Sequence, residues 1–325
     1  MNTITASELK RLFAGTDEFA LIDTREIADF YRGHLLGASL APLSRLELDI
    51  ERLVPRRKTH VVLSDWRSAQ ASESVLHSMG YTNVSTLAGG VQGWHLAGNR
   101  IFVGWNAIGK AFGSYIARTR RTPTVKAPEL KALIQGSRPL LILDTRTPEE
   151  HREYCIPGAL SCPNGETLYR ALDAIESRDQ LIVTHCAGFT RGIMGAQTLI
   201  DAGIENEVVS LYLGTMEWAL DGFSLEESAY RPLPVPRHRQ RALSVATRLR
   251  QAQRLRAVDA DTLAGWRQDR GRTLYLFDVR SLDETRTGTF PGATPIAGGQ
   301  LVHCVDRHIA TRGARVVLID DDGVR

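Results

Sequence analysis

Ile142-Leu143-Asp144-Thr145-Arg146 is a short apolar run that ends in an aspartate and an arginine, and the chain contains this pattern three times. The other two copies read Leu21-Ile22-Asp23-Thr24-Arg25 and Leu276-Phe277-Asp278-Val279-Arg280. In each copy a Gly-Ala pair follows, and its glycine lies 14 residues after the aspartate. The copies are 121 and 134 residues apart. This period is too long for a solenoid, so the pattern indicates tandem domains.

Each copy predicts a parallel α/β architecture. A helical pattern precedes the apolar run, as at Glu8–Phe13, where Thr5 and Glu8 have the spacing of a capping box. The helical patterns of the other copies begin near Pro128 and near Asp261. A second apolar run follows in each copy, at Val61–Leu63, Leu181–Val183 and Val316–Ile319. Such unalternated runs suit strands covered on both faces, and strands that alternate with helices indicate a parallel sheet flanked by helices.

We expect the chain to divide into five segments. The first copy, residues 1–103, and the second copy, residues 124–230, each form an α/β domain, and residues 104–123 link them. Residues 231–256 form a Pro/Arg-rich linker that is extended at its prolines and helical in its second half. The third copy, residues 257–325, stops at the loop after its second strand and is truncated. We expect it to be part of a longer protein, or to pack its apolar strands against the second copy or another chain.

Composition limits the functional classes. Of 325 residues, 43% are hydrophobic and 24% are charged, and the net charge is +3. The chain is therefore neither disordered nor basic enough to predict a nucleic-acid partner. No secretory signal or membrane-spanning stretch is evident, so no membrane partner and a cytoplasmic location are expected. The four cysteines lack CxxC spacing and predict neither a disulfide framework nor a metal site.

Eight arginines and no acidic residue lie in the second linker, residues 231–256. No aromatic residue interleaves with them, which argues against base stacking on RNA. We interpret this segment as an amphipathic helix that packs on a domain and exposes an arginine face.

The candidate site lies in the loop after the second strand of the second copy. At 42 residues after the motif aspartate, the three copies place Asp65, Cys186 and Asp320, so only the second copy has a nucleophile there. Ligands of open α/β sheets bind beyond the carboxyl ends of the strands. Backbone N–H groups surround a cysteine that opens a tight loop before a helix, and they favour an anion. We therefore predict Cys186 as the catalytic residue and the rest of its loop as substrate-binding residues, namely Ala187, Gly188, Phe189, Thr190 and Arg191.

These features resemble the rhodanese family of sulfurtransferases. The resemblance rests on the Asp-x-Arg strand end, the Gly-Ala turn, the cysteine loop and Leu87–Trp94, which is similar to the closing Gly-Gly-x-x-x-Trp pattern of the family. Leu213–Trp218 is a weaker version of that pattern. The resemblance implies tandem rhodanese-like domains, with an inactive first copy (Asp65), a catalytic second copy and an inactive third copy (Asp320).

The resemblance also implies a mechanism. Cys186 would take the outer sulfur of a small anionic donor, such as thiosulfate or 3-mercaptopyruvate, and hold it as a persulfide. A thiophilic acceptor (cyanide, a thiol or a protein) would then remove that sulfur, and no metal or organic cofactor would be needed. The loop matches neither the thiosulfate loop nor the mercaptopyruvate loop common in the family, so the donor stays open.

Two alternatives stay open. Fold relatives that act as phosphatases or arsenate reductases have a C-x5-R loop that accommodates a tetrahedral oxyanion. The loop from Cys186 to Arg191 is C-x4-R, which favours sulfur transfer. The second alternative is a non-enzymatic persulfide carrier that docks to partner proteins through its inactive copies.

The neighbouring polar and sulfur-containing residues are interpreted as scaffold. Asp144 and Arg146 have equivalents in the two copies that lack a loop cysteine, which argues against a direct catalytic role. Strand alternation points His185 away from Cys186. Cys155 and Cys162 are interpreted as packed residues of the interior.

Overall fold

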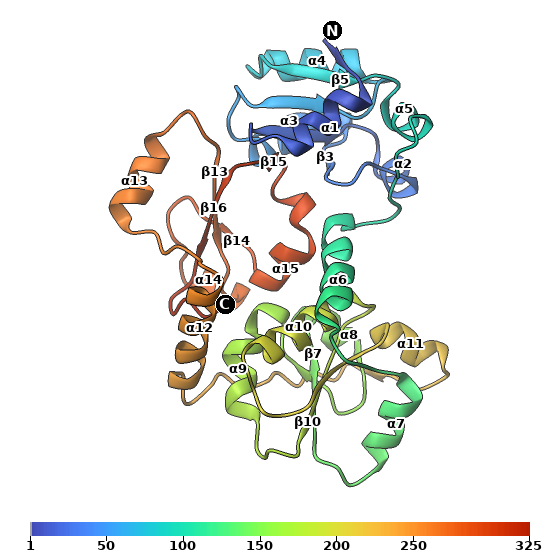
Figure 1. Ribbon diagram of the computed structural model, residues 1–325, viewed down its shortest axis with the longest axis vertical. Helices are drawn as coiled ribbons and strands as arrows, with labels where there is room; N and C mark the ends of the chain where they lie inside the picture. The colour runs from blue at the N-terminus through green and yellow to red at the C-terminus, as the bar shows by residue number, and fades with distance from the viewer. Residues whose placement is uncertain (1) are drawn as a thin grey trace. The chain divides into compact units, whose positions relative to one another are not determined.

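The first copy is a parallel sheet with helices on both faces, as the repeat pattern predicted. The computed structural model describes residues 2–325, and Figure 1 labels its elements. The strands of this copy are β1 (Thr3–Ile4), β2 (Phe19–Asp23), β3 (Ser39–Leu40), β4 (His60–Leu63) and β5 (Val84–Leu87). They are parallel and have the order β1-β5-β4-β2, with β3 beside β2. The helices are α1 (Ala6–Ala14), α2 (Ile27–Arg32), the 3-10 helix η1 (Leu43–Arg45), α3 (Leu46–Leu53), α4 (Ala69–Ser78) and α5 (Gly90–Leu96).

The second copy repeats this topology. Its main strands are β6 (Thr124–Val125), β7 (Leu140–Asp144), β9 (Leu160–Ser161), β10 (Leu181–His185) and β11 (Val208–Leu211). They are parallel and have the order β6-β11-β10-β7-β9. A separate antiparallel pair joins β8 (Tyr154–Cys155) and β12 (Glu226–Glu227). The helices are α7 (Ala127–Gln135), α8 (Pro148–Glu153), the 3-10 helix η2 (Asn164–Glu166), α9 (Thr167–Ala174), α10 (Thr190–Asp201) and α11 (Gly214–Leu220).

Both faces of the second sheet are covered by apolar clusters, and successive residues of a strand point into opposite clusters. In β7, Leu141 and Leu143 belong to a buried cluster with residues of α9 and α10. Ile142 lies between them and belongs to the opposite cluster, which contains the fully buried Trp218 of α11. This two-sided burial explains why the apolar runs in the sequence do not alternate with polar residues.

The predicted helix starts are confirmed. Helix α1 begins with a capping box in which Thr5 and Glu8 exchange side-chain to backbone hydrogen bonds. Helix α7 has a proline in its first turn. Helix α13 (Ala260–Gln268) begins at Asp259, whose side chain accepts from the backbone N–H of Thr262. No helix among residues 2–325 combines the length and apolar character that crossing a membrane requires.

Each Asp-x-Arg motif folds into the same ion pair, with a buried aspartate in every copy. In the second copy both side chains are fully buried, and Arg146 donates to Asp144 through Nε at 2.9 Å and through Nη2 at 2.7 Å. The same guanidinium also donates to the carbonyl oxygen of Tyr154. In the other copies, the equivalent bonds join Arg25 to Asp23 and the Gly33 carbonyl, and Arg280 to Asp278 and the Gly288 carbonyl. The predicted scaffold role of this motif is therefore confirmed.

The third copy holds the first half of the pattern. Its sheet has the order β14-β13-β16. The elements after α13 are β13 (Leu274–Asp278), α14 (Leu282–Arg286), β14 (Thr294–Pro295), α15 (Gly298–His303), the 3-10 helix η3 (Val305–Arg307), β15 (Thr311–Arg312) and β16 (Arg315–Ile319). Two apolar side chains of β16 are exposed, Val316 at 42% and Leu318 at 57%.

The described chain packs into two compact units, and the third copy contributes to both. One unit contains the first copy together with Val258–Leu276 and Cys304–Val317. Within that unit, β15 pairs antiparallel with the edge of β2. The other unit contains Gly109–Ala257, Phe277–His303 and Leu318–Arg325. The segment predicted as the third copy, residues 257–325, is therefore divided between the two units.

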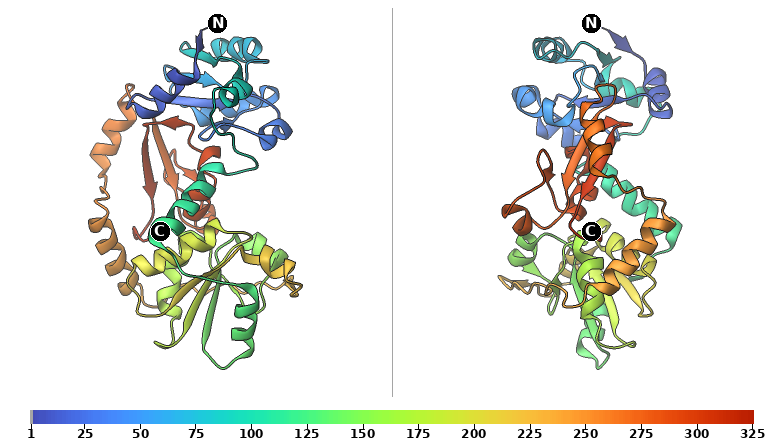
Figure 2. Two further views of the ribbon diagram at one scale, coloured as in Figure 1. Left: turned by 45° about the vertical axis from the view of Figure 1, so that its right-hand side comes forward. Right: turned by 90° about the vertical axis from the view of Figure 1, so that its left-hand side faces the viewer.

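The segments predicted as linkers are largely helical. In residues 104–123, α6 (Ala107–Arg120) forms, and its glycines serve close packing rather than flexibility. A Cβ atom on Gly113 would lie 2.8 Å from Cγ2 of Thr190, at the start of α10. In the second linker, α12 (Gln240–Ala252) buries Val245 and Ala246 in a cluster with α9, as the amphipathic pattern predicted, and Figure 2 shows the two helices side by side.

The Asp-x-Arg unit gives a first testable prediction. Arg146→Met removes the cation from a fully buried pair and leaves Asp144 without its main partner, so we expect a loss of about 3–5 kcal/mol in the free energy of unfolding. Arg138→Gln is the matched control, because its pair with Glu207 is exposed, and it should cost less than about 1 kcal/mol. Urea unfolding measures both, and equal losses in the two variants would contradict the scaffold role.

Candidate active site

Cys186 lies at the carboxyl end of β10, directly before the loop that leads into α10. Its side chain is buried, with 3% of the residue exposed, whereas Ala187, Gly188 and Phe189 are half-buried at the surface. The structure thus brings the six predicted site residues into one turn of chain between a strand end and a helix start. This is the position at which parallel α/β sheets bind ligands.

The backbone N–H groups of this loop are available to a ligand. Within residues 2–325, no acceptor is bonded to the N–H groups of Ala187 through Arg191. They belong to the loop between a strand end and the N-terminus of α10, a position that favours anions. These five donors therefore support the prediction that the loop binds an anion.

In the first copy, the equivalent loop has a carboxylate of the chain that accepts from its N–H groups. Asp65 stands at the position of Cys186, and its carboxylate accepts hydrogen bonds from the N–H groups of Arg67 and Ser68, each at 3.1 Å. The Ser68 hydroxyl donates to the same carboxylate at 2.5 Å. In the third copy, Asp320 accepts from the N–H groups of Val324 at 2.9 Å and Arg325 at 3.1 Å. A carboxylate of the chain thus occupies the equivalent loop wherever cysteine is absent.

Helix α11 supports the cysteine loop from behind. The N–H groups of Thr215 and Met216 donate to the carbonyl oxygens of Cys186 and Ala187, at 2.9 and 3.1 Å. The approach is close because Gly214 has a φ of +55° and no side chain, and a Cβ atom there would lie 1.9 Å from the Cys186 carbonyl oxygen. The sequence motif around Gly214 was recognised as a family pattern, but its role in holding the loop is visible only in the fold.

Arg191 is held by an acidic partner that the sequence analysis missed. Its Nη1 and Nη2 atoms donate to the two oxygens of Glu150, at 2.6 and 2.7 Å. Burial alone would lower the pKa of Arg191, but its bonds to Glu150 raise it above the ordinary value. The Nε atom is buried and has no partner within residues 2–325. Contact between Arg191 and a substrate anion stays a prediction, and Nε is the donor that the geometry leaves for it.

A signal for this pair was present in the repeats. An acidic residue lies six positions after the motif aspartate in every copy, at Asp29, Glu150 and Glu284. The loop ends in arginine in the second and third copies, where the acidic residue is glutamate, and the first copy has Gln70 at that position. Comparison of the copies at these two positions would have paired Arg191 with Glu150.

A buried polar cluster lies beneath the strand end. His151 Nδ1 is 3.0 Å from an oxygen of Asp144, and His185 Nδ1 is 4.0 Å from the other oxygen. Burial lowers the pKa of His185 to about 4, so its ring is neutral near pH 7. The ring of His185 therefore faces the Asp144 scaffold, in agreement with the alternation that predicted it to point away from Cys186.

The two other buried cysteines of the second copy are packed residues, as predicted. Cys155 and Cys162 are fully buried, and Cys162 belongs to the cluster beneath α9 and α10. Burial raises the pKa of Cys162 to about 12 and also raises the pKa of Cys155. Both thiols therefore stay protonated and unreactive near neutral pH.

A known domain family and several known proteins are similar to this chain. The rhodanese-like domain family matches residues 5–97 and 126–221. SseB of Mycobacterium tuberculosis strain H37Rv, provisionally named a thiosulfate sulfurtransferase, is 26% identical over 204 residues, which cover 51% of this chain and 71% of SseB. YqhL of Bacillus subtilis strain 168, a protein without an assigned function, is 33% identical over 95 residues, which cover 29% of this chain and 72% of YqhL.

A solved structure matches along the whole of the present chain. The crystal structure of a thiosulfate sulfurtransferase from Pseudomonas aeruginosa has a TM-score of 0.95 and is 37% identical. The match covers 100% of this chain and 62% of the Pseudomonas chain. The present chain therefore spans less than two thirds of the length of that relative.

Glycine at position 214 gives a second testable prediction. Gly214→Ala and Gly222→Ala both place alanine at positive φ, at +55° and +77°, which costs about 1–2 kcal/mol. Only at position 214 does the new Cβ atom collide with the cysteine loop, because nothing lies within 4 Å of it at position 222. We expect Gly214→Ala to lose a further 1–3 kcal/mol or so and to change the alkylation rate of Cys186 by iodoacetamide. Equal stability and alkylation rates in the two variants would contradict the support role of α11.

The buried ring of His185 gives a pH-dependent prediction. Its pKa is about 4 in the folded chain against the ordinary value of 6.5, so the unfolded chain takes up the proton first as the pH falls. The contribution of the neutral ring to the free energy of unfolding is fully present above about pH 6.5. It falls by roughly 2–4 kcal/mol as the pH is lowered from about 6.5 to about 4. His185→Gln should flatten this part of the stability profile, measured by urea unfolding at several pH values. The exposed His77→Gln should keep the wild-type profile, and an unchanged profile in His185→Gln would refute the assignment.

Proposed function

Because this chain belongs to the family of rhodanese-like domains, we propose that its second copy is a sulfurtransferase with Cys186 as nucleophile. The observation that carries the proposal is the set of unpaired N–H groups from Ala187 to Arg191 around the thiol. In the first copy, the equivalent groups bind the carboxylate of Asp65. The same loop geometry thus accommodates a negative charge, and in the second copy that charge comes from a ligand or from sulfur bound to Cys186.

The reaction we propose has two steps. With thiosulfate as donor, the Cys186 thiolate attacks the outer sulfur, a new S–S bond forms, and sulfite leaves with the electron pair of the broken S–S bond. The terminal sulfur of the resulting persulfide is negative, and the N–H groups of the loop stabilise it as they would an oxyanion. In the second step cyanide or a thiolate attacks that sulfur, and the electron pair of the persulfide bond returns to Cys186 as thiolate. A protein thiol is an equally suitable acceptor in this scheme.

The geometry favours sulfur transfer over oxyanion chemistry. The loop has four residues between Cys186 and Arg191, and two of the three guanidinium nitrogens are bonded to Glu150. A tetrahedral phosphate or arsenate needs several donors around three oxygens, and it would have to compete with Glu150 for this arginine. A single sulfur atom needs only the N–H groups of the loop.

Sulfur uptake is the direct test of the proposed function. Intact-protein mass spectrometry under non-reducing conditions, after thiosulfate and separately after 3-mercaptopyruvate, should show a gain of about 32 Da that cyanide removes. Cys186→Ser should abolish the gain without unfolding the chain. Cys155→Ser and Cys162→Ala are the matched controls, since both thiols are buried away from the loop, and they should keep it.

Other results would assign a different chemistry. Turnover of a phosphoester or arsenate without sulfur uptake would replace the proposal with the oxyanion reaction. A Cys186 persulfide that passes only to a specific protein, and never to cyanide or small thiols, would identify a carrier rather than an enzyme of small-molecule transfer. Sulfur uptake retained by Cys186→Ser would refute the proposal.

A further inference from the structure

The loop of the third copy keeps the length and the final arginine of the catalytic loop. It runs from Asp320 to Arg325, with the same four-residue spacing as Cys186 to Arg191. Arg325 Nη2 donates to Glu284 at 2.8 Å, which reproduces the pair between Arg191 and Glu150. The third copy thus preserves the ion pair of the candidate site although it has no cysteine.

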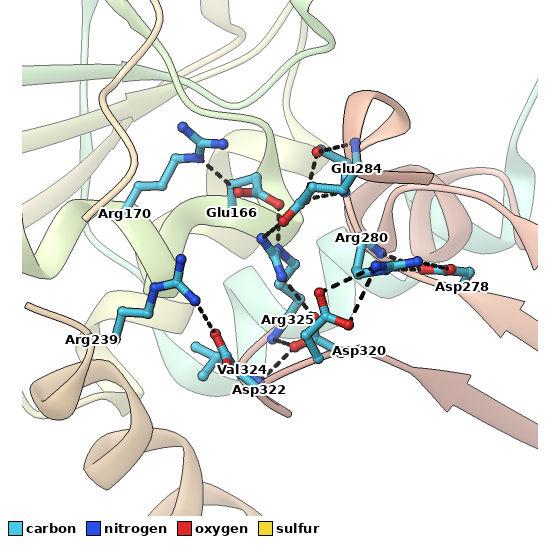
Figure 3. Close-up of polar contacts among 12 residues, drawn as sticks. Glu166, Arg170, Arg239, Asp278, Arg280, Glu284, Asp320, Asp322, Val324 and Arg325 are labelled. Atoms are coloured by element: carbon cyan, nitrogen blue, oxygen red, sulfur yellow. Dashed lines mark hydrogen bonds and ion pairs between the residues drawn. The ribbon is translucent and has the colours of Figure 1, made fainter. Parts of the chain in front are cut away.

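Arg325 has a second set of partners that Arg191 lacks. Its guanidinium is 1% exposed, and its Nε atom donates to Glu166 of the second copy at 2.6 Å. Its Nη1 atom donates to Asp320 at 2.7 Å, and its Cζ atom lies 4.2 Å from the centre of the Tyr169 ring. Figure 3 shows the guanidinium between these carboxylates. One buried cation therefore joins the loop of the third copy to η2 and α9 of the second.

Glu166 is held from both sides. Its Oε1 atom accepts from Arg325, and its Oε2 atom accepts from Arg170 at 2.7 Å. The backbone next to it is also enclosed, because a Cβ atom on Gly299 of α15 would lie 2.8 Å from the N atom of Gly165. The position of η2 is thus set by the third copy through an ion pair and through direct backbone packing.

A short chain of hydrogen bonds leads from η2 to the cysteine. The N–H group of Asn164 donates to the carbonyl oxygen of Thr145 at 3.2 Å. Thr145 in turn donates to the carbonyl oxygen of His185 twice, from its N–H group at 2.8 Å and from its hydroxyl at 2.7 Å. His185 directly precedes Cys186. The strand end that presents the thiol is therefore tied to the segment that Arg325 holds.

We propose that Arg325 is a positioning residue for the catalytic loop, acting through Glu166 and η2, so that the third copy serves as a brace for the active copy. The inference rests on the proposed function of Cys186. Without Arg325, the buried carboxylates of Glu166 and Asp320 and the partly exposed carboxylate of Glu284 lose the cation that they share. Their repulsion then displaces η2 and the bonds from Thr145 to the strand end.

The test is a double-mutant cycle on the full chain. Arg325→Gln and Glu166→Gln should each lower kcat for sulfur transfer from thiosulfate to cyanide by about three- to tenfold, with KM for thiosulfate within about twofold of wild type. The double variant should lose no more than the more damaged single variant, because both changes break the bond between Arg325 and Glu166. Arg286→Gln is the matched control: this arginine is exposed in α14 and forms an ion pair with Asp283, so kcat should not change.

Stability is measured in the same samples, and activity is compared at a temperature at which every variant is folded. Arg325→Lys keeps the positive charge and should recover part of kcat. If Arg325→Gln does not fold, the cycle is measured with Arg325→Lys and Glu166→Gln instead. An unchanged kcat in folded variants, multiplicative losses in the double variant or a raised KM would overturn the inference. If the wild-type chain takes up sulfur and the variants keep its kcat, the positioning role of Arg325 is refuted but the proposed function is not. If the wild-type chain takes up no sulfur, the proposed function is refuted.

Discussion

The ion pair between the buried aspartate at a strand end and the arginine two residues later is the constraint on which each copy depends. The arginine also donates to a carbonyl oxygen eight residues beyond the aspartate-arginine turn, at Gly33, Tyr154 or Gly288. The pair therefore fixes both the end of the strand and the return of the chain toward the next one. In the second copy, the two histidines beside Asp144 and the bonds from Thr145 to His185 extend this unit to the residue that precedes Cys186.

On this common scaffold the loop after the second strand differs in each copy. In the first copy, Asp65 binds the loop N–H groups and closes the loop on itself. In the second, Cys186 brings no carboxylate, and no acceptor within residues 2–325 is bonded to these groups. In the third, Asp320 again binds its own loop, and Arg325 extends from it to Glu166. One backbone geometry thus serves as a closed loop, a candidate anion site and a docking contact.

Sequence patterns predicted most of the architecture and the location of the site because both depend on local signals. The apolar runs, the capping box at Thr5 and the equal spacing of Asp65, Cys186 and Asp320 are local or periodic. The partner of Arg191 was missed because Glu150 is distant in sequence and only the fold brings the two together. The segment 104–123 was predicted to be a linker because of its glycines, but α6 forms there, and Gly113 permits contact with Thr190. A glycine in sequence does not reveal whether it serves flexibility or close approach.

The central claim is that the N–H groups of Ala187 to Arg191 receive the negative sulfur bound to Cys186. A crystal structure of the thiosulfate-treated chain at high resolution tests this most directly. We expect one additional sulfur atom bonded to Sγ of Cys186, facing these N–H groups, with Cys155 and Cys162 unmodified. An additional atom on another cysteine, or a Cys186 persulfide turned away from the loop and held by other residues, would contradict it.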